Sequence, residues 1–93
     1  MKAHYIVKGI VQGVGYRAFV TEVARKYGVR GFVRNLPDGD VEIFAEAQQD
    51  LLKMFENEIS NYSRGEAEIY EIEKHYNESA LSKYSYSDFR IEY

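Results

Sequence analysis

The sequence contains no cysteine, no tryptophan and a single proline. Without cysteine, the chain cannot form disulfides, a thiolate nucleophile, an iron–sulfur cluster or a cysteine-ligated zinc site. No apolar run approaches the roughly 20 residues that a transmembrane helix needs. The first residues also lack the apolar segment and cleavage site of a signal peptide. We therefore expect a cytoplasmic protein that has no membrane partner.

Positive charge is also scarce, and it is unevenly distributed. The 93 residues carry 12 Lys and Arg against 15 Asp and Glu, which gives a net charge of −3. This balance argues against a nucleic-acid partner. Residues 1–34, however, carry seven basic and one acidic side chain, whereas residues 35–93 carry five basic and fourteen acidic ones. The asymmetry predicts a local anion site in the first third of the chain.

Clusters of metal-ligand side chains are missing as well. The two histidines, His4 and His75, lie far apart in the sequence, and no carboxylates stand at ligand spacing beside them. We interpret both as surface residues of strands, and we expect no metal and no cofactor. The length fits one domain, 1–93, and we expect a monomer.

Apolar periodicity predicts the secondary structure. The expected elements are a first strand through Tyr5, Val7 and Val11, a helix at about 16–27, strands at 31–35 and 41–46, a helix at about 48–61, and strands at about 66–76 and 89–93. We expect a bulge within 66–76, a loop over 77–87, and a solvent-facing side on 41–46. The order βαββαβ predicts a ferredoxin-like α+β fold, with an antiparallel sheet and two helices on one face.

A glycine-rich segment, residues 9–17 (Gly-Ile-Val-Gln-Gly-Val-Gly-Tyr-Arg), lies between the first strand and the first helix. Unpaired N–H groups at a helix start, together with the helix dipole, favour an oxyanion there. Arg17 adds a planar fork of donors that matches a phosphate. The alternative interpretation is a glycine-bearing turn with Arg17 as a surface charge. A dinucleotide-binding fold needs a longer chain, and the Lys of a phosphate-binding P-loop is absent.

Asn35 ends the second expected strand, just before the turn Leu36-Pro37-Asp38-Gly39. It is either an Asx-turn residue or a carboxamide that holds a water molecule through its oxygen. At the other end of the chain, the Tyr93 carboxylate pairs with Arg17 if the last strand ends near the glycine-rich segment. The alternative there is a frayed terminus.

Two segments together resemble the signatures of the acylphosphatase family. Residues 9–17 are similar to the first signature and residues 31–41 to the second, in the family's order and at its usual separation. Tyr16 stands where the family usually has phenylalanine, Ala47 stands where glycine is common, and residues 64–66 lack a frequent proline. None of these departures affects the chemistry considered above, and the similarity spans nearly the whole chain.

The resemblance implies a ferredoxin-like fold and the hydrolysis of acyl phosphates to a carboxylate and inorganic phosphate, which would also compete with the substrate. It implies that Arg17 binds the phosphoryl oxygens and that Asn35 orients the attacking water. The backbone N–H groups implied to complete the phosphate site are those of Gln12, Gly13, Val14, Gly15 and Tyr16. No metal is needed, because phosphoryl transfer depends on positioning and charge stabilisation, and a carboxylate leaves without a general acid.

Three other functions remain open. The first is a binding module of the same fold that senses a phosphorylated metabolite. The second is a carbamoyl-phosphate-handling domain, similar to those at the start of much longer hydrogenase-maturation proteins. The third is an RNA-binding domain of similar topology, although the aromatic strand with basic flanks that it requires is missing.

Overall fold

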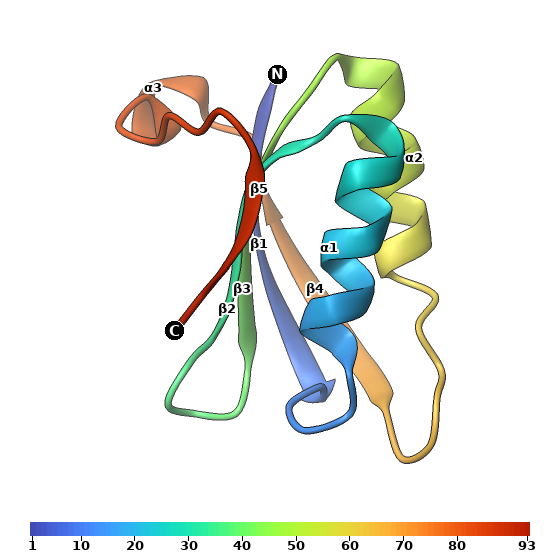
Figure 1. Cartoon of the computed structure of the whole chain (residues 1–93). Helices are drawn as coiled ribbons and strands as arrows, with labels where there is room; N and C mark the ends of the chain where they lie inside the picture. Colours follow the sequence, from blue (N-terminus) through green and yellow to red (C-terminus); the bar gives the residue numbers. More distant parts are fainter.

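The computed structural model describes all 93 residues, and a five-stranded sheet with two helices on one face forms its frame (Figure 1). In chain order the elements are β1 (Lys2–Ile10), α1 (Tyr16–Tyr27), β2 (Arg30–Asn35), β3 (Val41–Glu46), α2 (Gln49–Ile59), β4 (Glu68–His75), α3 (Glu78–Leu81) and β5 (Phe89–Glu92). None of the helices has the length and apolar content that crossing a membrane requires.

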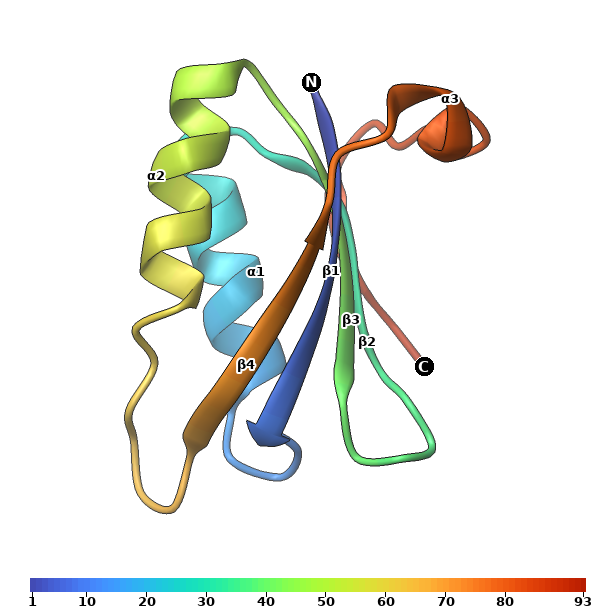
Figure 2. The ribbon, with the colours of Figure 1, turned by 180° about the vertical axis from the view of Figure 1, so that it is seen from behind.

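The strands are ordered β4-β1-β3-β2-β5. The pairs β1–β3, β1–β4 and β2–β3 are antiparallel, which confirms the predicted ferredoxin-like arrangement. Strand β5 departs from the expected antiparallel sheet, because it runs parallel to β2. After β4 the chain crosses from one edge of the sheet to the other, as Figure 2 shows from behind, and it enters the far edge in the same direction as β2.

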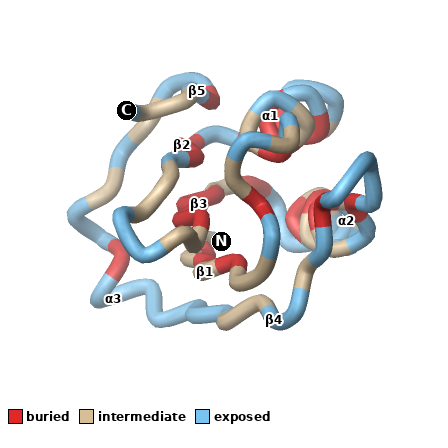
Figure 3. Tube along the Cα trace, turned by 90° about the horizontal axis from the view of Figure 1, so that it is seen from below, coloured by how far each residue is buried: buried red, intermediate tan, exposed pale blue.

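The main core lies between the sheet and the helices α1 and α2. Alternate side chains of β1, including Ala3, Tyr5 and Val7, are fully buried there, as the alternation predicts. Phe55 and Ile59 of α2 meet them from the helical layer. Figure 3 shows buried segments on the strands of the sheet and on both helices. The burial of these apolar side chains is the main force that joins the layers.

The opposite face of the sheet is covered too. Phe32 and Phe44 form a second, smaller cluster with Leu81, and Tyr84 and Tyr86 pack against it. The prediction that 41–46 has a solvent-facing side is therefore wrong: Phe44 is fully buried, and Glu42 of the same strand is only 8% exposed. The cause is long-range, since the segment after β4 folds back over this face and forms α3 within the expected loop 77–87.

The predicted bulge is present in β4. Lys8 of β1 lies opposite Glu71, but the next residue, Gly9, lies opposite Ile69. Tyr70 is thus the extra residue, and it is exposed. A bulge bends the strand pair and increases its twist. This bend lies at Lys8 and Gly9 of β1, where the glycine-rich segment begins.

Candidate active site

Residues 11–15, here called the cradle loop, connect β1 to α1 at the lower end of the sheet in Figure 1. Gly13 and Gly15 have φ angles of 73° and 79°, in the left-handed region that glycine enters without strain. The backbone N–H groups of Gln12, Gly13, Val14 and Gly15 donate to no acceptor within the chain. Consecutive free N–H groups beside a helix start form an anion site. The loop therefore offers four donors to a bound oxyanion.

Arg17 stands in the first turn of α1, directly beyond the cradle loop. Its guanidinium forms no ion pair. Of the two alternatives for the C-terminus, the pairing of the Tyr93 carboxylate with Arg17 is not formed; the centre of the Tyr93 ring lies 5.2 Å from the guanidinium carbon, at cation–π distance. Tyr93 is 99% exposed, and Arg17 itself is half-buried and lines a surface depression.

A depression of about 180 Å³ opens in front of Arg17. Its lining residues are Val11, Gly13, Gly15, Tyr16, Arg17, Ala18 and Ile91. No carboxylate and no imidazole is among them, and burial raises the pKa of Tyr16, whose hydroxyl donates to the Ile59 carbonyl at 2.8 Å. Tyr16 is therefore a neutral anchor of the helix start. The depression combines one cation with free N–H donors, which suits a phosphate group.

Tyr62 supports the cradle loop from behind. Its hydroxyl donates to the Val14 carbonyl at 2.5 Å, and its ring lies 4.7 Å from that of Phe19 and 5.3 Å from that of Tyr16. By turning the Val14 carbonyl toward this hydroxyl, the contact leaves the opposite side of the loop to N–H groups. Sequence analysis missed Tyr62, because a contact across 48 residues leaves no local signal.

Asn35 ends β2, and the β2–β3 hairpin projects from the same end of the sheet as the cradle loop (Figure 1). Its side-chain oxygen Oδ1 is buried and has no hydrogen-bond partner. Buried acceptors in folded proteins are nearly always paired with protein or water. Asn35 is not among the residues that line the depression, but the Gln12 side chain bonds to the turn that follows it. The Oδ1 atom is thus a buried acceptor whose hydrogen-bonding capacity is unused within the chain.

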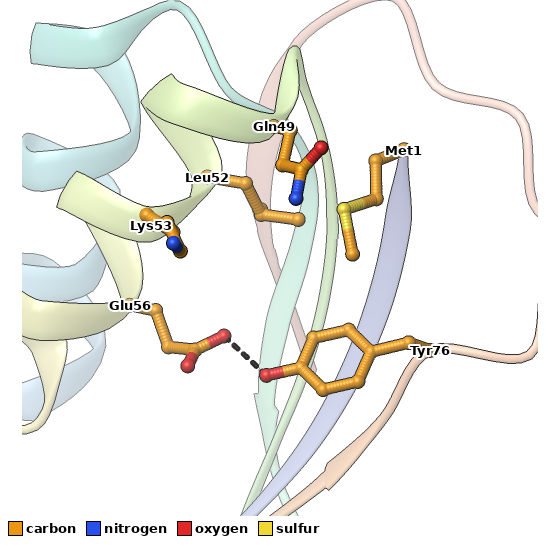
Figure 4. A pocket seen from close by; sticks show the side chains of 6 residues that line it. All are labelled: Met1, Gln49, Leu52, Lys53, Glu56 and Tyr76. Carbon is orange, nitrogen blue, oxygen red and sulfur yellow. Dashed lines mark hydrogen bonds between the residues drawn. The ribbon is translucent and has the colours of Figure 1, made fainter.

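A second cavity, of about 110 Å³, lies between α2 and the sheet (Figure 4). Its one carboxylate, Glu56, accepts from the hydroxyls of Tyr5 at 2.9 Å and Tyr76 at 2.6 Å, and it pairs with Lys74 at 3.1 Å. Burial raises the pKa of Glu56, but these bonds outweigh it and lower the pKa overall. The Glu56 carboxylate is therefore held in a network of two hydroxyls and one ammonium group.

The histidines lie at the other end of β1. His4 pairs with Glu42 at 2.8 Å, and the rings of His4 and His75 are 6.0 Å apart. Strands rise about 3.3 Å per residue, so His4 lies roughly 20 Å from the cradle loop. No group of three or more metal-ligand side chains occurs in the chain.

The family model for acylphosphatases matches residues 3–91 of the chain. The chain belongs to the acylphosphatase family. A relative named acylphosphatase from Methanospirillum hungatei is 44% identical over 80 residues, which cover 86% of each chain. The crystal structure of acylphosphatase from Bacillus subtilis superposes with a TM-score of 0.87 at 33% identity, and it covers 99% of this chain and 98% of its own.

A longer protein contains the same fold. The crystal structure of HypF from T. kodakarensis superposes with a TM-score of 0.78 at 32% identity over 99% of this chain, but over only 12% of its own. The fold therefore occurs both as a chain of acylphosphatase length and as a small part of a larger protein. The matches to the acylphosphatases of Methanospirillum hungatei and Bacillus subtilis cover 86% and 98% of those proteins, and they support an acylphosphatase activity for this chain.

Proposed function

We propose that this acylphosphatase binds the phosphoryl group of an acyl phosphate in the cradle loop and hydrolyses it by direct attack of water. The water oxygen bonds to phosphorus, and the bond from phosphorus to the carboxyl oxygen breaks. The leaving carboxylate keeps the bonding electron pair, and one water proton passes to the phosphate. The proposal rests on one observation: the free N–H groups of the cradle loop, the unpaired Arg17 and the buried, unpartnered Oδ1 of Asn35 all occur at the same end of the sheet.

Arg17 and the loop donors stabilise charge on the phosphoryl oxygens. Four consecutive N–H groups are already free of protein acceptors, so no internal hydrogen bond of the loop has to break when the anion binds. We include the N–H of Tyr16, the first residue of α1, because the first N–H groups of a helix have no intrahelical acceptor. The guanidinium supplies two parallel donors, which a lysine ammonium cannot reproduce.

Asn35 orients the nucleophile in this proposal. Its Oδ1 accepts a hydrogen from the water, and this bond directs a lone pair of the water toward phosphorus. No side chain that lines the depression can act as a general base. We therefore assign the water proton to a phosphoryl oxygen of the substrate.

The first test compares Arg17→Ala and Arg17→Lys in an assay with benzoyl phosphate. Both variants should lose activity by about 100- to 1,000-fold, because each lacks a donor pair that acts in the transition state. Arg25→Ala is the matched control, since Arg25 is an exposed arginine near the end of the same helix. Normal turnover in Arg17→Ala would overturn the proposal.

The second test separates water orientation from phosphate binding. Asn35→Ala should lower kcat strongly while inorganic phosphate still inhibits with nearly its original Ki. Asn57→Ala, which changes an exposed asparagine on α2, is the control. An equal collapse of phosphate affinity would assign Asn35 to anion binding instead.

The same assay distinguishes the competing functions. A sensor of the same fold would bind phosphate without turning over benzoyl phosphate. A carbamoyl-phosphate-handling domain would prefer carbamoyl phosphate by kcat/KM. We also propose that residues 1–93 form one domain, because β1 and β5 bring segments near both ends of the sequence into one sheet. In this proposal the domain acts as a monomer on a small molecule.

A further inference from the structure

The side-chain amide of Gln12 links the cradle loop to the β2–β3 hairpin. Its Nε2 donates to the Leu36 carbonyl at 2.8 Å and to the Asp40 carbonyl at 2.9 Å. A carboxamide nitrogen carries two hydrogens, so both are used in these bonds. Leu36 directly follows Asn35 in the chain. The amide is therefore anchored next to the residue that we expect to hold water.

The two acceptors belong to a turn that is closed by its own hydrogen bonds. The N–H of Leu36 donates to the Asp40 carbonyl at 2.8 Å, and the N–H of Gly39 donates to the Leu36 carbonyl at 3.2 Å. The N–H of Asp40 also donates to Oδ1 of Asp38 at 2.9 Å. These bonds fix the shape of the turn, but they do not fix its position relative to the cradle loop.

The sheet holds the backbone of Asn35, which lies opposite Val41 at the end of the β2–β3 ladder, but it does not hold the turn that follows Asn35. The ladder between β1 and β3 ends at Val7 and Val41, and β1 is paired only with β4 from Lys8 to Ile10. Beyond this point the cradle loop and the hairpin leave the sheet as separate segments. The Gln12 side chain reconnects them past the end of the ladder.

We propose that the Gln12 side chain is a positioning residue, which holds Asn35 at a fixed place relative to the phosphate bound by the cradle loop. The inference rests on the proposed function, because it assumes that Asn35 orients the attacking water. Water must approach phosphorus opposite the leaving carboxylate, so the group that holds the water and the group that holds the phosphate need a fixed separation. A misplacement of about 1 Å can cost about 100-fold in rate.

The experiment uses Gln12→Ala, which removes both side-chain bonds but keeps the backbone N–H of the cradle loop. We expect kcat for benzoyl phosphate to fall about 10- to 100-fold while the Ki of inorganic phosphate changes less than about threefold. Gln48→Ala is the matched control, because Gln48 is exposed and its side chain forms no capping hydrogen bond. If Gln12→Ala does not fold, Gln12→Met removes the same donors at similar side-chain volume.

A double-mutant cycle on kcat tests whether Gln12 acts through Asn35. In the Asn35→Ala background, the Gln12 substitution should lower kcat by less than about threefold, since the water-holding group is already gone. Additive losses would overturn the positioning role while leaving the role of Asn35 intact, and so would normal kcat in the single Gln12 variant. If Asn35→Ala itself keeps normal kcat, the proposed function fails and the positioning role fails with it.

Discussion

Two glycines of the cradle loop provide a quantitative test of how it is built. Gly13 and Gly15 have nearly equal φ angles, 73° and 79°, but different surroundings. A Cβ atom on Gly13 would meet nothing within 4 Å, whereas one on Gly15 would lie 3.1 Å from the Tyr62 hydroxyl. Alanine at either position pays the left-handed penalty of about 1–2 kcal/mol. Only alanine at position 15 also has to displace a neighbouring group, the Tyr62 hydroxyl.

The Tyr62 hydroxyl accounts for the expected difference in the free energy of unfolding between the two variants. The Tyr62 hydroxyl donates to the Val14 carbonyl at 2.5 Å, and the packing of its ring on Phe19 opposes a shift of a few tenths of an ångström. A weakened hydrogen bond costs about 0.5–1.5 kcal/mol. We therefore expect Gly13→Ala to lower the free energy of unfolding by about 1–2 kcal/mol and Gly15→Ala to lower it by about 1.5–3.5 kcal/mol.

Tyr62→Phe provides the decisive background, because it removes the hydroxyl that the new Cβ approaches. In this background Gly15→Ala should cost no more than Gly13→Ala. The free energies are measured by urea unfolding followed by circular dichroism, with the slope m checked for constancy. The reasoning is refuted if Gly15→Ala costs the same with and without the Tyr62 hydroxyl, or if Gly13→Ala is the more damaging variant.

Three further outcomes follow from the structure. EDTA should leave the turnover of benzoyl phosphate unchanged, because no carboxylate or imidazole lines the depression; loss of activity that added Mg²⁺ restores would contradict this. The pH profile of kcat between about pH 5 and 8 should show no histidine ionisation, and His4→Asn should match the wild type in this profile, since His4 lies at the far end of β1. Burial raises the pKa of Glu42, but hydrogen bonds from His4 and Arg34 outweigh it and lower the pKa overall. The ionised Glu42 carboxylate therefore stabilises the fold at pH values above 4.5, which is its pKa in the unfolded chain. This contribution is lost as the pH falls through the lower pKa that Glu42 has in the folded protein. The stability advantage of the wild type over Glu42→Gln should accordingly shrink between pH 6 and pH 3, and a constant difference in urea unfolding would contradict the assignment.

Local patterns predicted much of this fold because most elements have one buried face. The alternation of β1 and the helical spacing of α1 follow from burial on one side, which the sequence expresses within a few residues. The bulge of β4 was predictable for the same reason, since its apolar residues change parity. The glycine-rich segment was informative because free N–H groups and positive φ angles are requirements on the backbone itself.

Features set by distant segments were not predictable in this way. The parallel pairing of β5 with β2 depends on where the chain crosses the sheet, and no local periodicity encodes that. Phe44 is buried because the segment after β4 returns over it, and Glu42 is held between His4 and Arg34 of the two neighbouring strands. Tyr62 and the side-chain bonds of Gln12 connect parts of the chain that are far apart in sequence, so a single sequence contains no signal for either.

The strand order has a consequence for how the protein folds. The cradle loop and Asn35 both lie in the first 35 residues, but β1, from which the loop begins, is a central strand whose outer neighbour is β4. Pairings between strands that are distant in sequence close large loops, and chains with such pairings fold slowly. The start of the cradle loop is thus held by a strand that is fully paired only when β4 has docked along it.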